Sequence, residues 1–285
     1  MFCRPVIPVR NSSIMPDEIR FHATPFGGID AMSATTVRSF PRHTHDQYGL
    51  GVIDSGGHAS LSDRGQVEAG PRSMIFVNPG EVHDGRAIAG RQRSWRMLYF
   101  ESADLQRVWD DIGVRGSRSL AFAAPTFADE TLRALFNVAF RRVTKNAASR
   151  SLMECETAIL GMVARARLNS TAQPQKADSG APRIGRVREL IDADPASPEL
   201  TLTRLAREAG LSRYQLLRGF SREFGLTPHA YILQRRIALA RQLIRAGSGL
   251  ADASLRAGFF DQSHFTHVFS RQTGVAPGHY ALRTR

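Results

Sequence analysis

Two stretches of the 285-residue chain decide its fold: LTRLAREAGLSRYQLLRGF at residues 202–220 and LADASLRAGFFDQSHFTHVF at residues 250–269. They are diverged copies of one pattern, in which a short amphipathic segment, a glycine, a polar residue and a second amphipathic segment follow one another. Gly210 aligns with Gly258 and, after one added residue in the second turn, Ser212 aligns with Asp261. The repeat predicts that one helical unit occurs twice.

Each copy has the residues that such a unit needs. The glycine allows the left-handed backbone that ends a helix and reverses the chain. Ser212 and Asp261 are good N-caps, because their side chains accept hydrogen bonds from the first free amides of the next helix. Apolar pairs four residues apart then turn one face inward, Leu216 with Phe220 and Phe265 with Phe269. Together these features predict two helix-turn-helix units, whose second helices enter the major groove of DNA.

One long helix is predicted between the two units, from Pro228 to Ala246. Apolar positions such as Ile237 and Ile244 recur at helical spacing, and arginines occupy other positions. About 19 residues of helix span roughly 28 Å, which is near the roughly 34 Å of one DNA turn. We therefore expect both second helices to enter successive major grooves on one face of the DNA.

The charge of the chain is concentrated in the same region. The whole chain carries +12, and residues 182–285 hold 16 arginines, no lysine and 8 acidic residues, a net of +8. This asymmetry favours a polyanionic partner, either nucleic acid or a membrane surface, over a merely soluble basic face. Two cysteines form no disulfide framework, and neither a signal core nor a membrane-spanning apolar run is present. We expect a cytoplasmic protein without membrane contact.

The first hundred residues have a different pattern. Short β-favouring runs alternate with turns rich in Gly, Asn and Pro, which predicts a small barrel or sandwich. The predicted strands are Val37–His43, Gly49–Asp54, His58–Ser62, Ser73–Val77 and Trp95–Phe100.

Helical spacing begins after this region, and two amphipathic helices are predicted on either side of residues 145–149. Their apolar stripes either pack on the barrel or form a dimer interface. The segment Asn169–Pro182 has almost nothing apolar and is predicted to be a linker. The predicted parts are a flexible tail at 1–18, a barrel at 19–105, a helical dimerisation region at 106–168, a linker at 169–182 and a DNA-binding domain at 183–285.

The C-terminal part resembles the AraC/XylS family of transcription regulators over Ile184–Tyr280. The resemblance rests on Ala209-Gly210-Leu211-Ser212, Phe224-Gly225, Pro228, Gly258-Phe259, Phe265, Phe269, Gly274, Pro277 and Tyr280. It implies base contacts by Arg213, Tyr214, Leu217, Arg218, Gln262, Ser263, Thr266 and His267. The chain departs from the family pattern at Ala253-Ser254, where a bulky residue and Ala are usual, and at His267, where Arg is common.

Individual roles follow from side-chain chemistry. Arg218 is the best candidate for a base contact, since a guanidinium pairs bidentately with guanine, with a phosphate contact as the alternative. Gln262 either reads adenine or lies solvated near the cap. The long-helix residues Arg235, Arg236 and Arg241 are predicted to contact the DNA backbone or to stay solvated rather than to specify sequence.

In the front domain, His43-Thr44-His45 and Pro79-Gly80-Glu81-Val82-His83 resemble the cupin barrel that binds effectors in many AraC-type regulators. His43 and His45 alternate along one strand and should face the same side. Facing inward with His83, they could hold a metal, hydrogen-bond a small effector or be structural. Metal-using cupins usually add a Glu after the second His, but residues 46–50 read DQYGL. We therefore predict effector binding and no metal or other cofactor, with Arg38, Tyr48, Asn78, Glu81 and Tyr99 as further pocket residues.

These observations predict an α+β protein, with a cupin-like barrel and helical hairpin, a linker, and an all-α domain of two helix-turn-helix units. The predicted function is a sequence-specific DNA-binding regulator, an activator, which responds to a small effector and works as a homodimer. RNA polymerase is a further expected partner. The alternative is a metal-dependent cupin enzyme with a basic appendage. It rests on three histidines alone, and no nucleophile triad, phosphate-cradling glycine loop or Cys-x-x-Cys accompanies them, so we predict no enzyme.

Overall fold

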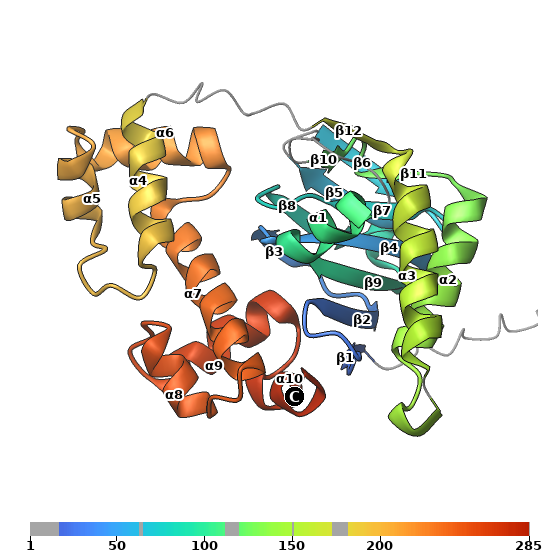
Figure 1. The fold of residues 1–285 in the computed structure, drawn as a ribbon. Coiled ribbons are helices and arrows are strands. Elements are labelled where there is room, and N and C mark those ends of the chain that lie inside the picture. Colours follow the sequence, from blue (N-terminus) through green and yellow to red (C-terminus); the bar gives the residue numbers. More distant parts are fainter. Residues whose placement is uncertain (1–16, 63–64, 112–119, 150, 173–181, 285) are drawn as a thin grey trace, which may run out of the picture.

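The computed structural model describes residues 17–62, 65–111, 120–149, 151–172 and 182–284. It contains a strand-rich barrel with helices on one side and a separate helical domain beside it (Figure 1). This architecture confirms the predicted α+β class. The predicted N-terminal tail lies largely outside the described residues, and the first strand begins at Glu18.

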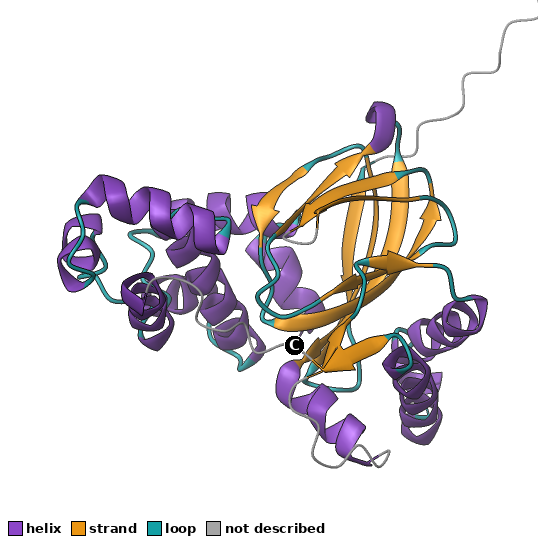
Figure 2. Cartoon of the chain, turned by 90° about the horizontal axis from the view of Figure 1, so that it is seen from above, coloured by secondary structure: helices purple, strands orange, loops and turns teal. Residues whose placement is uncertain are grey.

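Two antiparallel sheets form the barrel, and Figure 2 shows their strands curving around a common interior. The larger sheet has the order β1 (Glu18–His22), β2 (Ile29–Thr36), β9 (Arg93–Glu101), β4 (Gln47–Ser55), β7 (Met74–Val77) and β11 (Thr126–Phe127). The smaller sheet has the order β3 (Phe40–His43), β8 (His83–Ala87), β5 (His58–Ser62) and β6 (Gly65–Ala69). In the β3–β8 pair His43 lies directly opposite His83, so pairing register alone brings these two histidines together.

All five predicted strands are present, although β3 begins only at Phe40 and β4 and β9 extend further than expected. Sequence patterning missed β2, because its run IDAMSATT consists mainly of small residues with weak strand propensity. It is nevertheless largely buried between β1 and β9. The polar strand β8 was missed for the related reason that its sequence HDGRA lacks β-favouring residues.

Three helices pack on the barrel: α1 (Ser102–Asp111), α2 (Glu130–Val143) and α3 (Leu152–Arg167). The side chains of Asp129 and Ser151 cap α2 and α3, and the apolar stripes of both helices join the core of the larger sheet. The predicted linker begins too early, since Ser170–Ala172 forms strand β12, which pairs with β10 (Leu120–Phe122). Two single-turn 3₁₀ segments, η1 (Ile88–Gly90) and η2 (Ala147–Ser149), complete this half.

The helical domain contains α4 (Pro182–Ala193), α5 (Leu202–Glu208), α6 (Arg213–Phe224), α7 (Pro228–Arg245), α8 (Leu250–Arg256), α9 (Gln262–Thr273) and α10 (Pro277–Thr284). The repeat has its predicted form. Gly210 and Gly258 adopt φ values of 61° and 81° after α5 and α8. Ser212 caps α6 in a capping box, and Asp261 caps α9 by accepting from the His264 amide at 2.6 Å.

The two helix-turn-helix units differ in where their cores lie. The first unit, α5 and α6, packs with α4 around its own apolar cluster. The core of the second unit, α8 and α9, is continuous with apolar residues of the barrel. The Phe21 ring on β1 meets the Tyr280 ring on α10 edge to face at 5.1 Å, so the second unit is docked on the barrel.

Candidate functional site

A cavity of about 170 Å³ lies between the mouth of the barrel and α7. The barrel supplies apolar walls that include Phe21, Met32, Trp95 and Met97. Helix α7 supplies the opposite wall with Gln234, Ile237, Ala238, Arg241, Gln242 and Arg245. Both domains therefore enclose this space, and α7 is also the helix that joins the two helix-turn-helix units.

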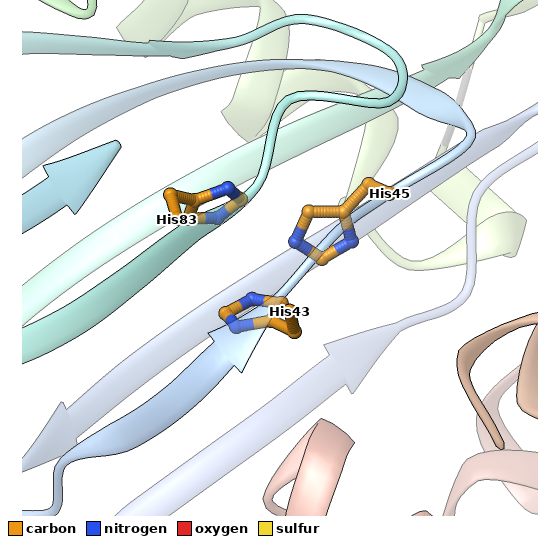
Figure 3. A group of neighbouring side chains, drawn as sticks. All are labelled: His43, His45 and His83. Carbon is orange, nitrogen blue, oxygen red and sulfur yellow. The ribbon is translucent and has the colours of Figure 1, made fainter. Parts of the chain in front are cut away.

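Three imidazole rings gather at the cavity, from β3, from the segment between β3 and β4, and from the start of β8 (Figure 3). The ring centroids of His43 and His83 are 4.5 Å apart, and His45 lies 4.9 and 5.2 Å from them. His43 Nδ1 donates to the Pro41 carbonyl at 2.7 Å and His83 Nδ1 donates to the Glu81 carbonyl at 3.1 Å, because a carbonyl can only accept. In both rings the lone pair is thereby left on Nε2.

Burial keeps these rings uncharged. It lowers the pKa of His43 to about 3, with a further contribution from His83, and lowers the pKa of His83 to about 4. The pKa of His45 also lies well below its usual range, first because of burial and then because of the two neighbouring rings. Burial raises the pKa of Tyr99 to about 12, so its phenol stays protonated. This part of the cavity therefore offers neutral donors and acceptors at pH 7.

The three histidines also have the arrangement of a metal site. One nitrogen from each ring lies within 4.8 Å of the others, and imidazole suits zinc, iron or nickel. Backbone carbonyls fix the tautomers of two rings, as is usual for metal-ligating histidines. The Glu81 carboxylate is engaged elsewhere, because it accepts from the Asn78 side chain at 3.0 Å. The residues present thus fit a three-histidine site without a carboxylate ligand.

Most of the predicted pocket residues meet at this cavity. Those that line it are His43, His45, Glu81, His83 and Tyr99.

Tyr48 and Asn78 do not line the cavity, which corrects their predicted role. Tyr48 points to the other side of β4, where its ring lies 5.4 Å from Trp109 and 5.9 Å from Phe122. Residues 44–46 do not form a strand, so the alternation of side chains between the two faces of β3 does not continue into β4. The side on which Tyr48 lies therefore cannot be counted from His45. Asn78 is buried and holds the Phe122 backbone, accepting from its amide at 2.8 Å and donating to its carbonyl at 3.3 Å.

Several cavity residues went unrecognised in the sequence. Arg93, Trp95, Met97 and Tyr99 are all buried and alternate along β9, and the last three line the cavity. Tyr99 was predicted, so extending its alternation backwards would have found the others. The residues of α7 give no such signal, because their contact with the cavity depends on how two domains dock.

The predicted DNA-reading residues form two separate outward faces. On α6, Arg213, Tyr214 and Arg218 are exposed and Leu217 is half-buried. Arg218 donates to the Tyr214 hydroxyl at 3.4 Å and lies 5.6 Å from its ring. On α9, the exposed residues are Gln262, Ser263 and His267, and Thr266 is half-buried.

The face of α9 borders the barrel. Arg38, which was predicted to line the effector pocket, instead lies with Gln262 and His267 around a surface hollow. Its guanidinium donates to the Ser270 carbonyl on α9 at 3.3 Å. The chain turns outward after β2, so Arg38 is exposed beside the helical domain instead of facing the barrel interior.

Comparison with known proteins matches both halves of this arrangement. A family model described as an AraC-like ligand binding domain matches residues 26–160, and one described as a helix-turn-helix domain matches residues 205–283. The chain belongs to the AraC family of helix-turn-helix transcription regulators. It is therefore a DNA-binding regulator with a ligand-binding domain and not an enzyme. None of the helices in the described ranges has the length and apolarity needed to cross a lipid bilayer.

Individual relatives support this AraC-family assignment. The uncharacterised regulator YbfI of Bacillus subtilis is 27% identical over 232 residues, which cover 80% of this chain and 82% of YbfI. The transcriptional activator NphR of a Rhodococcus species is 35% identical over 98 residues, 34% of this chain and 29% of NphR. ToxT of Vibrio cholerae, in a structure bound to an unsaturated fatty acid, shares the fold with a TM-score of 0.54 at 13% identity, covering 90% of this chain and 94% of ToxT.

In this AraC-family chain, the arginines of α7 are engaged inside the protein. Arg241 pairs with Asp30 of β2 at 2.7 Å, and Arg245 pairs with Asp30 at 3.2 Å and with Glu101 at 2.9 Å. Arg235 pairs with Asp46 and, at 2.9 Å, with Asp192.

The third predicted DNA-backbone residue, Arg236, donates to the carbonyls of Pro195 and Ser197 at 2.8 and 3.4 Å. Contact of Arg235, Arg236 or Arg241 with a DNA phosphate would require release from these partners. We call the pairing of Arg241 and Arg245 with Asp30 and Glu101 the α7 latch.

Proposed function

We propose that this AraC-family regulator is an activator whose engagement of DNA is set by a small molecule in the cavity between the barrel and α7. The observation that carries the proposal is that α7 forms one wall of this cavity and also joins the two reading helices. An occupant that reaches this wall therefore touches the element that fixes their separation. Two similar proteins support this combination of functions. NphR is a transcriptional activator, and ToxT, which shares the fold, is bound to an unsaturated fatty acid in its structure.

The proposed DNA contacts come from the exposed faces of α6 and α9. Arg218 pairs with a guanine, because its fork matches the two acceptors on that base, and Gln262 reads an adenine. Their neighbours on both helices complete the contact: Arg213, Tyr214, Leu217, Ser263, Thr266 and His267.

The regulator is proposed to act as a homodimer through the outer side of α2 and α3. Large apolar side chains are exposed there, among them Met153 at 76% and Leu152 at 57%. Exposed apolar groups of this size mark interaction surfaces when they gather on one face. A dimer would present four reading helices to paired half-sites, and an activator bound there would contact RNA polymerase.

A DNA-binding titration tests this function. The protein is titrated onto fragments flanking its own gene at about 150 mM salt with excess competitor DNA, which suppresses non-specific binding. We expect tight binding to one fragment and its loss in Arg218→Ala. Equal, salt-sensitive binding to every fragment would contradict the proposal.

A metal-responsive form of the same regulator is a second candidate. It is favoured by the fixed tautomers of His43 and His83, which aim their lone pairs away from the backbone. Equilibrium dialysis with Ni²⁺ or Zn²⁺ tests it. One tightly bound ion per chain, lost in His83→Ala, would support it, and no stoichiometric binding would remove it.

A further inference from the structure

Arg93 is a buried cation with no anionic partner in the part of the chain that the structure describes. It opens β9 with a side chain that is 0% exposed, and its guanidinium lies 4.8 Å from the Trp95 ring. Its Nε donates to His58 Nδ1 at 3.1 Å, but neither of its two terminal nitrogens has a hydrogen-bond partner. Within the described residues no carboxylate pairs with it. Asp84, on the neighbouring strand β8, accepts instead from the Leu61 amide at 2.7 Å and pairs with Arg86.

An unpaired charge in the protein interior destabilises the folded state. Burial lowers the pKa of Arg93 only to about 10, so the side chain remains charged at pH 7. Buried charges in proteins are normally paired, because an isolated ion loses its hydration without compensation. The two terminal nitrogens present the parallel N–H groups that bind a carboxylate in bidentate fashion. Among the described residues this fork has no anion to bind, so it is available to an anionic ligand.

His58 adds a second donor beside this fork. Arginine Nε always carries a proton, so the bond at 3.1 Å requires His58 Nδ1 to accept. The proton of the neutral ring then lies on Nε2, which can donate in turn. One guanidinium and one imidazole N–H are thus presented together.

His58 lines the cavity already described, and Arg93 lies directly behind it. Trp95 and Gly85 also line this cavity. Gly85 leaves the approach open, since a Cβ added there would lie 3.2 Å from the His58 ring and 3.8 Å from a terminal nitrogen of Arg93. No side chain at position 85 therefore stands between a ligand in the cavity and the guanidinium of Arg93.

The remaining walls limit what the ligand can be. They include Trp95, Met97, Ile75 and Phe40, which favour an apolar body. The volume of about 170 Å³ is similar to that of a cavity of about 150 Å³ that holds benzene. We propose that Arg93 and His58 form the anion-binding end of the effector cavity, and that the effector is a small monocarboxylate with a compact apolar body.

This inference rests on the proposed regulatory function. It is tested with pairs of ligands that have the same apolar body and differ in charge. Cyclohexanecarboxylate and 3-methylbutanoate are compared with their uncharged amides by thermal unfolding and calorimetry on the full chain. Ligands that bind the folded state raise Tm with concentration. At least one acid should raise Tm at millimolar concentration while its amide does not. Equal responses to acid and amide, or no response to either acid, would overturn the proposal.

Substitutions place the binding at Arg93. Arg93→Met should weaken binding of the acid by about 30-fold or more, since the charged partner is removed from a buried contact. Without ligand this variant should unfold at the same Tm as the wild type or higher, because an unpaired buried charge is gone. Arg96→Met is the control, because Arg96 lies on the other face of β9 and pairs with Asp54. Unchanged acid binding in a folded Arg93→Met, or a large loss in Arg96→Met alone, would contradict the assignment.

The DNA titration separates this inference from the proposed function. Sequence-specific DNA binding with no carboxylate bound would remove the anion site and leave the regulator. Carboxylate bound at Arg93 without any change in DNA binding would keep the site and remove its regulatory role.

Discussion

The two helix-turn-helix units arise from one repeated sequence pattern but have different surroundings. The first unit packs with α4 around a core of its own. The second unit shares its core with the barrel, through contacts such as Phe21 with Tyr280, and Arg38 of the barrel bonds to α9. Local sequence sets the form of a reading unit, whereas tertiary docking sets how freely it can move. The ligand-binding domain therefore contacts the DNA-reading part of the protein directly at the second unit.

The largest expected effect comes from removing the central ring of each unit. Phe220 and Phe269 are both fully buried, so Phe220→Ala and Phe269→Ala should each cost about 3–5 kcal/mol. Hydrogen exchange should separate them. Phe269→Ala should also lower amide protection in β1 and β3, which pack on α10 and α9, while Phe220→Ala should leave these strands protected. Equal loss of barrel protection in both variants would contradict the difference between the units.

Breaking the α7 latch should give the next largest effect. Asp30 is buried and accepts from both Arg241 and Arg245, so Asp30→Ala should lower the free energy of unfolding by about 3 kcal/mol. Asp46→Ala removes the more exposed partner of Arg235 and should cost about 1 kcal/mol or less. Urea unfolding measures both. Similar decreases in the free energy of unfolding in the two variants would show that the α7 latch stabilises the protein no more than the Arg235–Asp46 pair does.

The reading faces themselves should differ in DNA affinity. Arg218→Ala on α6 removes a proposed guanine contact and should weaken specific binding by about 2 kcal/mol, roughly 30-fold. His267→Ala on α9 should have a smaller effect, because the barrel already constrains that face. Fluorescence anisotropy on the footprinted fragment gives both values. A larger loss in His267→Ala would reverse the proposed order of the two units.

Much of this account could be predicted from the sequence where the interactions are local. Helix caps at Ser212 and Asp261, the glycine turns and the spacing of His43 and His45 all depend on residues close in the chain. Assignments that depended on strand phase were less secure, as Tyr48 shows. Features that arise from docking could not be predicted, because nothing local marks Arg241 as the partner of Asp30, 211 residues away.

The stability of the protein should also depend on pH. Burial lowers the pKa of His43, His58 and His83 to about 3 or 4 in the folded state. The unfolded chain therefore binds more protons below pH 6.5, and stability is full above that value and falls as pH decreases towards 4. Urea midpoints at pH 7.0, 5.5 and 4.5 should show this fall, with a shallower slope in His58→Gln. A flat profile would contradict the burial of these rings.

A footprint on the specific DNA fragment tests most directly whether the barrel restrains the second reading unit. Wild-type protein without effector is compared with Asp30→Ala, in which the latch is broken, and with Asp46→Ala as the matched control. We predict that Asp30→Ala protects about one additional DNA turn in each half-site, as α9 becomes free to enter the next major groove, whereas Asp46→Ala matches the wild type. Identical footprints for all three proteins would show that docking on the barrel does not limit how the second unit reads DNA.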